Sequence, residues 1–482
     1  MLSNQRWIDK RLPVGHQASV VIPSFFTPEE FAEIAAGTIH PVDQVPDLGG
    51  LLNQVIDTNL SMKPQDLAES RIRCIKEICK LVQDTRAENK MVMDSLPAKG
   101  RRIHCNKNFV ALRSLLQKHK YADVVVVDHV AAGTCLTGAS ECAAIFEKCE
   151  KRKAVPEAVL KELSPWIRDM VKNRTCSGGD VDQQALWKKT MEEVEAGWLE
   201  GPVDPAELDR EFCSQWISAQ RFALQQGKKL RPIDNFSISQ VNNGFEIKEH
   251  LHLDGPETVA ACLRRILAAG RSRGRKMKWL GTTIDLRAAY RHQHVSQESE
   301  WCSITAVLNP NTGEVMYFKV LALPFGATAA VFSFNRCSRA IQYLCCIELF
   351  VICLSFYDDF TVLTEEELKA TALISCQLLI RLLGWEDATD KGASFAELFT
   401  TLGVTFDISR MPMGEFDMRC KAGRLEDIQV LLDECRRRGE IPVDCLRGKL
   451  QFASGQTFGK VAVEALHALS CFNGVVKSKV AV

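Results

Sequence analysis

The stretch LSFYDDFTVL, residues 354–363, places two adjacent aspartates, Asp358 and Asp359, between two apolar runs. Runs rich in β-branched and aromatic residues on both sides of a polar pair predict a tight hairpin with the carboxylates at its tip. An Asp-Asp pair is also ordinary turn chemistry, and that interpretation stays open. The alternative is a divalent cation, because Mg²⁺ takes oxygen ligands and usually keeps only one or two protein carboxylates.

A third carboxylate lies upstream, at the end of the apolar run KWLGTTIDL, residues 278–286. This run predicts a buried strand, and Asp285 lies where the strand gives way to a polar segment. A strand-end aspartate beside a hairpin-tip pair would form a metal site suited to phosphoryl transfer. Without a cation, the like charges would repel one another and one pKa would rise.

Length and composition limit the class of protein. A chain of 482 residues predicts two or three domains, and its formal net charge of zero argues against a basic protein that coats nucleic acid. The 19 cysteines include no CxxC pair, which favours reduced thiols in a cytosolic or nuclear protein. The N-terminus lacks the apolar core of a signal peptide, and the longest apolar run is too short to cross a bilayer, so we expect no membrane association.

Patterning predicts the remaining elements. Residues 221–237 predict a strand, a glycine turn and a second strand, and residues 301–323 predict another hairpin. Helices are expected over residues 327–346 and 424–438, the latter ended by Gly439. Two helical faces are expected to be apolar: Trp187, Met191, Val194 and Trp198 on a helix stopped by Gly201 and Pro202, and Leu425, Ile428, Leu432 and Cys435 on the helix over 424–438.

Five motifs together resemble one known family. FYDD matches the [YF]-x-D-D hairpin of reverse transcriptases, DLRAAYRHQHV resembles their first palm motif, and LPFGATAAVFSFNR resembles the second. KLRPIDNFS resembles their fingers segment, and TDKGASFAELFTTLGVTF their later lysine motif and primer-grip hairpin. The five stand in the family's order over residues 214–410. RGKLQFASGQTFGKV, and more weakly DHVAAGTCLTG and EVEAGWLEGP, resemble segments of retrotransposon enzymes related to the tyrosine-recombinase group.

The resemblance implies an α+β fold of the right-hand polymerase type, with fingers, palm and thumb and an antiparallel palm sheet. It places fingers and palm at residues 201–410 and a partial, helical thumb at 411–482. A mostly helical region, residues 106–200, would lead into the fingers, and residues 1–105 have no assigned role. The expected activity is that of an RNA-directed DNA polymerase.

The family's metal ligands map onto four positions. The resemblance makes Asp285 and Asp358 the direct ligands and gives Asp359 a supporting, less direct contact. The backbone carbonyl of Leu286 would add a further oxygen. The expected cofactor is Mg²⁺, with Mn²⁺ as a substitute.

Five residues are implied to bind the nucleotide. Tyr290 stands at the steric-gate position, where an aromatic ring would clash with a ribose 2′-hydroxyl. Phe325 and Gly326 would pack under the incoming nucleotide and the template base. Lys229 and Arg231 would hold the triphosphate. Without the resemblance, two other interpretations stay open: Tyr290 as a core tyrosine, and Lys229 as part of a solvated turn.

The resemblance implies two further roles, and the sequence departs from the family's pattern at two positions. Lys391 matches the lysine that protonates the leaving pyrophosphate, and Leu402 and Gly403 match the primer grip. Val331 stands where the family usually has proline, which should shift the start of the helix. Arg231 lies three residues before Asp234, whereas the corresponding spacing in many members of the family is four residues.

The expected partners are an RNA or DNA template with its primer, and deoxynucleoside triphosphates. The basic run at residues 271–278 suits either a phosphate-backbone contact or a solvated loop. One alternative is an inactive retroelement remnant that binds nucleic acid. Another is an RNA-dependent RNA polymerase, although those carry Gly-Asp-Asp and a smaller gate residue. We expect an intracellular protein, and cytoplasm and nucleus are both left open.

Overall fold

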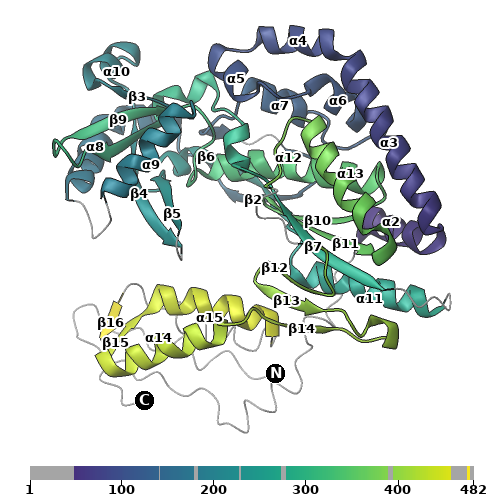
Figure 1. Cartoon of the computed structure of the whole chain (residues 1–482). Helices are drawn as coiled ribbons and strands as arrows, with labels where there is room; N and C mark the ends of the chain where they lie inside the picture. The colour runs from purple at the N-terminus through teal and green to yellow at the C-terminus, as the bar shows by residue number, and fades with distance from the viewer. Residues whose placement is uncertain are drawn as a thin grey trace. The chain divides into compact units, whose positions relative to one another are not determined.

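The computed structural model describes residues 48–139, 142–177, 183–226, 229–272, 278–388, 394–457 and 475–477. The chain divides into two compact units (Figure 1). The larger consists of Gly49–Asp254 and Ala268–Ala396, and the smaller includes Gly255–Leu267 and the described part of Glu397–Val482. Helix α11 (Pro256–Ser272) contributes to both. The mixed helix and strand class expected from the sequence is confirmed.

The larger unit begins with a layer of helices. These are α2 (Gly49–Ser61), α3 (Pro64–Asp84), α4 (Arg86–Ser95), α5 (Ala98–Ile103), α6 (Phe109–Lys118) and α7 (Val126–Ala132). The buried residues of α3 recur at helical spacing, so one stripe faces inward. Helix α3 packs along α13 (Lys369–Leu382), while α2, α6 and α7 contact α12 (Thr328–Ile347) (Figure 1).

A five-stranded sheet has the order β3-β9-β8-β4-β5. Its strands are β3 (Leu199–Val203), β4 (Ser218–Gln226), β5 (Lys229–Asn235), β8 (Ile304–Leu308) and β9 (Val315–Val320), all paired antiparallel except β4 with β8. Both predicted hairpins of this region are therefore confirmed. A short helix, α10 (Pro205–Glu211), follows β3.

Helices α8 (Glu157–Cys176) and α9 (Gln183–Glu195) cover opposite faces of this sheet. Phe318 packs against Trp187 of α9, while its neighbour Tyr317 packs against Trp216, which Arg168 of α8 covers. Because successive strand residues point to opposite faces, the two helices lie on different sides. The central strands of the sheet are thus covered on both faces, and β8 is accordingly buried along most of its length.

The predicted end of the helix containing Trp187 is wrong. Helix α9 stops at Glu195, and Gly197 adopts a φ of 75°, a left-handed conformation that a glycine readily takes. Trp198 therefore lies outside the helix, and Gly201 and Pro202 lie within strand β3 rather than ending α9.

A three-stranded antiparallel sheet has the order β10-β11-β7, from Ile352–Phe356, Asp359–Glu365 and Trp279–Asp285. Helix α12 packs against β10 and α13 against β11. The predicted strand, hairpin and helix of this region are confirmed. Val331 lies in the first turn of α12, which begins at Thr328.

The other elements of the larger unit are short. Strands β1 (Gly138–Ala139), β6 (Phe245–His250) and β2 (Glu147–Arg152) form a small sheet. The 3₁₀ turns are η2 (Val241–Gly244), η3 (Ala289–His292), η4 (Gln297–Cys302) and η5 (Glu366–Leu368).

The smaller unit combines a three-stranded meander with two helices. Its elements are β12 (Leu398–Thr401), β13 (Val404–Asp407), η7 (Met411–Met413), β14 (Asp417–Cys420), α14 (Arg424–Arg438), β15 (Glu440–Pro442), α15 (Val443–Thr457) and β16 (Val475–Lys477). Gly439 ends α14 with a φ of 65°, as predicted. Ile428 and Cys435 are buried, but Leu425 at the start of the expected apolar face is 60% exposed, so that part of the prediction is wrong.

The cysteines of the described ranges are thiols outside disulfide bonds. Within the same ranges, every helix is too short or too polar to cross a membrane.

Candidate active site

The hairpin has Tyr357 and Asp358 as its two turn residues. Phe356 pairs with Asp359, so β10 ends and β11 begins on either side of a two-residue loop. Tyr357 takes a φ of 53°, and positive φ values are what tight hairpin turns require. Asp358 therefore lies at the tip, and Asp359 is the first residue of β11.

Strand β7 brings the third aspartate to the same end of the sheet. Asp285, the last residue of β7, is the direct partner of Asp359 across the antiparallel pair. One residue on, the backbone N–H of Leu286 donates to the carbonyl oxygen of Asp358 at 3.2 Å. Directly opposite residues have Cβ atoms about 4.5–5.5 Å apart on one face, so the ladder itself brings Asp285 and Asp359 together.

The donor set suits a hard cation. Carboxylates from two strand ends supply oxygen atoms only, which Mg²⁺ prefers over nitrogen or sulfur. Leu286 forms a β-bridge with Asp387, and the hydrogen bonds of this bridge are made by its two neighbours, through the carbonyl of Asp285 and the N–H of Arg287. The carbonyl oxygen of Leu286 makes neither of these bonds. Over the described ranges, no group of three or more His, Cys, Asp or Glu side chains converges as a metal cage. Mg²⁺ needs no such cage, since one or two carboxylates with water and phosphate oxygens are its usual shell.

Tyr290 belongs to a cluster of aromatic rings. Tyr290 lies in η3, after Ala288, whose φ is 48°. Its ring centroid lies 5.1 Å from that of Phe325 and 4.8 Å from that of Phe334. Burial, and then the negative charge of Asp358, raise the pKa of the Tyr290 hydroxyl, so Tyr290 lies within electrostatic reach of the hairpin tip.

Gly326 is required by a close backbone approach. Its φ is 104°, and a Cβ at this position would lie 2.1 Å from the carbonyl oxygen of Asp234. The N–H of Asp234 donates to the Phe325 carbonyl at 3.1 Å. Asn242 donates to the Gly326 carbonyl at 2.9 Å and accepts from the N–H of Thr328, the first residue of α12, at 2.8 Å. The Phe325–Gly326 loop is thus held from two sides.

The other predicted site residues lie as follows. Arg231 is exposed on β5, the edge strand of the five-stranded sheet, and Lys229 begins that strand. Leu402 and Gly403 form the β12–β13 turn of the smaller unit, with φ values of 50° and 76°. Lys391 lies outside the described residues, as does most of the basic run at 271–278.

Residues that support the hairpin were not predicted. Strand β10 is at the sheet edge, where unpaired backbone groups need other partners. The Ser355 N–H donates to the buried carboxylate of Asp254 at 3.0 Å, and Gln342 donates to the Cys353 carbonyl at 3.0 Å. Ser338 donates to the Tyr357 carbonyl at 2.6 Å. The available signal was two polar residues four apart, Ser338 and Gln342, on one face of a helix that is mostly buried.

The chain has likenesses among solved structures. No family model matches the chain, and no curated protein matches its sequence. A solved structure that does match is a foamy viral protease–reverse transcriptase in complex with double-stranded DNA, with 11% sequence identity and a TM-score of 0.42. The match covers 81% of this chain and 56% of that one, so this chain spans little more than half the length of the viral protein.

Proposed function

We propose that this chain is an RNA-directed DNA polymerase of a retrotransposon-like element, adding deoxynucleotides to a primer 3′ end. One observation carries the proposal. Asp285 and Asp359 pair across two strands, Asp358 occupies the tip beside them, and Tyr290 lies within electrostatic reach of that tip. These residues come from segments about 70 positions apart, and only the fold brings them together.

The elements support assignment to parts of a polymerase. The β10-β11-β7 sheet with α12 and α13 would be the palm, and the five-stranded sheet with α8 and α9 the fingers. Helices α14 and α15 would belong to the thumb.

Asp285 and Asp358 would hold the catalytic Mg²⁺, with Asp359 in support and the Leu286 carbonyl as a further ligand. When bound, the metal supplies Lewis-acid chemistry: it favours ionisation of the 3′-hydroxyl and neutralises charge on the triphosphate. The chain's own contribution is positioning, since phosphoryl transfer asks the protein mainly to align its reactants and fix charges. The hairpin ladder fixes the carboxylates, and the Phe325–Gly326 loop provides a rigid surface for the nucleotide.

Tyr290 would select the sugar. Its ring is stacked on Phe334 and packed against Phe325, so it cannot swing aside at low cost. A fixed ring at this place would clash with a ribose 2′-hydroxyl. This is the feature that favours a DNA polymerase over an RNA polymerase with the same palm.

Primer extension tests the proposal. Purified protein is given an RNA template with an annealed DNA primer, Mg²⁺, and either deoxynucleotides or ribonucleotides. The expected result is extension with deoxynucleotides and much weaker use of ribonucleotides. Protein that is folded and binds the primed template but adds no nucleotide would instead support the inactive-remnant alternative.

A further inference from the structure

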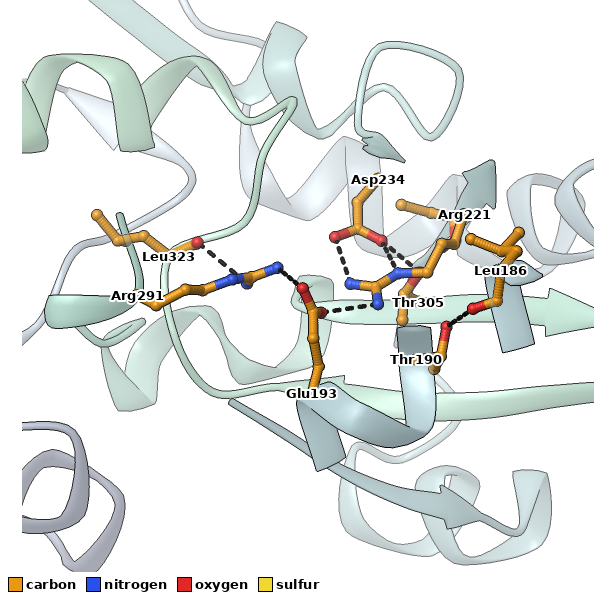
Figure 2. A network of polar contacts seen from close by, with 9 residues as sticks. Leu186, Thr190, Glu193, Arg221, Asp234, Arg291, Thr305 and Leu323 are labelled. Carbon is orange, nitrogen blue, oxygen red and sulfur yellow. Dashed lines mark hydrogen bonds and ion pairs between the residues drawn. The ribbon is translucent and has the colours of Figure 1, made fainter. Parts of the chain in front are cut away.

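Four buried charged side chains form one network in the larger unit (Figure 2). Arg221 of β4 makes a two-point contact with Asp234 of β5, Nε to Oδ1 at 2.8 Å and Nη2 to Oδ2 at 3.0 Å. Glu193 of α9 accepts from Arg221 at 2.8 Å through one oxygen and from Arg291 at 2.7 Å through the other. The two arginines and two carboxylates balance in charge.

Glu193 joins the Arg221–Asp234 pair to Arg291. Removing charge from a buried network leaves its partners unpaired, which is far more costly than losing an exposed ion pair. Burial raises the pKa of Asp234, but the Arg221 guanidinium more than offsets this, so that pKa stands below its usual range. Thr305 also donates to Asp234 at 2.7 Å.

The network reaches the residues proposed to bind the nucleotide along two routes. On one route, Arg291 directly follows Tyr290, donates to the Leu323 carbonyl at 3.2 Å, and holds its guanidinium 5.6 Å from the Phe325 ring centroid. On the other, Asp234 contacts the Phe325–Gly326 loop through its backbone. Glu193 is therefore connected through Arg291 to the segment of Tyr290, and through Arg221 and Asp234 to the Phe325–Gly326 loop.

We propose that Glu193 is a positioning residue for sugar selection, acting through Arg291 to fix the spacing between Tyr290 and Phe325. The inference rests on the proposed function, because it assigns Glu193 to the specificity of that same pocket. A displacement of about 1 Å near a reacting centre can change rates by about 100-fold, so a loosened gate should admit ribonucleotides more readily. A purely structural network would instead affect stability and leave selectivity unchanged.

Glu193→Gln is the test, and Glu192→Gln is its matched control. Glu192 is the preceding residue on α9, and its exposed side chain pairs with Lys189 at 2.6 Å. For each protein, kcat and KM are measured for one deoxynucleotide and its ribonucleotide. We expect the ratio of the two kcat/KM values to fall about 10-fold in Glu193→Gln and to stay unchanged in Glu192→Gln. An unchanged ratio in folded Glu193→Gln would overturn the proposal.

A second measurement does not depend on activity. The chain has five tyrosines, so protein labelled with 3-fluorotyrosine gives five ¹⁹F resonances, and Tyr290→Phe identifies that of Tyr290. Glu193→Gln should shift or broaden this resonance, whereas Glu192→Gln should not. If the wild type fails to extend primers but the shift occurs, the proposed function fails while the positioning contact stands. If the wild type polymerises and neither ratio nor resonance changes, the positioning role fails alone.

Arg291→Lys is a second variant that tests the proposal if Glu193→Gln does not fold. Lysine keeps the positive charge beside Glu193 but cannot reach the carboxylate and the Leu323 carbonyl together. It should lower the selectivity ratio and shift the Tyr290 resonance in the same direction. A folded Arg291→Lys protein with wild-type values for both would count against the proposal.

Discussion

Asp359 lies directly opposite Asp285 in the β7–β11 ladder, and the carbonyl of the preceding residue, Asp358, accepts a hydrogen bond from the N–H of Leu286. The backbone hydrogen bonds of the ladder therefore set the separation of the two residues that carry these carboxylates. Like charges placed directly across two strands destabilise the pair unless something compensates them. A cation bound there would relieve this repulsion.

Two substitutions at Tyr290 separate the ring from the hydroxyl. Tyr290→Phe should keep deoxynucleotide selectivity, because the ring packed on Phe325 and Phe334 provides the clash. Tyr290→Val should raise ribonucleotide incorporation at least about 10-fold, because discrimination through one steric contact amounts to about 1–3 kcal/mol. Single-nucleotide incorporation with matched deoxy- and ribonucleotides measures both. Equal selectivity in Tyr290→Val and the wild type would remove Tyr290 from the gate.

Asp254 should be needed for the stability of the hairpin edge. It accepts from Arg339 at 2.6 Å, from Gln342 at 2.6 Å and from the Ser355 N–H at 3.0 Å. Asp254→Ala leaves these donors without their acceptor and should lower the free energy of unfolding by about 3–5 kcal/mol. Denaturant unfolding measures the loss. Asp94→Ala, at an exposed ion pair with Lys90, should change stability by at most about 1 kcal/mol.

Gly326 and Gly313 offer a matched pair of glycine substitutions. Both have positive φ, 104° and 71°, so alanine is strained at either. Only at Gly326 would the new Cβ meet backbone, the Asp234 carbonyl oxygen at 2.1 Å, whereas Gly313 has nothing within 4 Å. Gly313→Ala should destabilise by about 1 kcal/mol and Gly326→Ala by about 3 kcal/mol or more. Thermal unfolding of the two variants compares them, and equal losses would contradict the close approach.

Acid should destabilise the fold through buried neutral histidines. Burial, and then the positive charge of Lys99, lower the pKa of His294 to about 4, from an ordinary value of 6.5. Between pH 6.5 and 4 the unfolded chain binds a proton at this position that the folded chain does not, so stability falls as the pH decreases. His129, with a pKa of about 4, acts in the same direction.

The contribution of His294 can be isolated by substitution. In His294→Gln, the slope of unfolding free energy against pH should decrease by about 1.4 kcal/mol per pH unit within that window. His252→Gln, at an exposed position, serves as the control and should leave the slope unchanged. Denaturant unfolding at a series of pH values measures both, and identical slopes in wild type and His294→Gln would refute a neutral buried His294.

The hairpin and the strand ending at Asp285 were predictable because alternation and turn chemistry are local signals. Their pairing register was not predictable, because it depends on how β7 and β11 meet across about 70 residues.

Glu193 was also missed, since an acidic residue on an amphipathic helix predicts solvent exposure. Only the fold shows that two arginines, Arg221 and Arg291, converge on its carboxylate. The end of α9 was misplaced because Gly201 and Pro202 are stronger stop signals than Gly197, yet the chain turns at the earlier glycine.

The most direct test of the central claim is single-nucleotide incorporation by Asp358→Asn on a primed RNA template with Mg²⁺. Asp66→Asn, at an exposed position in the first turn of α3, is the matched control. Asparagine keeps the size of the side chain and removes the charge, so folding and template binding should persist while incorporation falls by about 100-fold or more. Incorporation by Asp66→Asn should match the wild type. If Asp358→Asn incorporates deoxynucleotides at the wild-type rate, the hairpin carboxylates are not the catalytic centre.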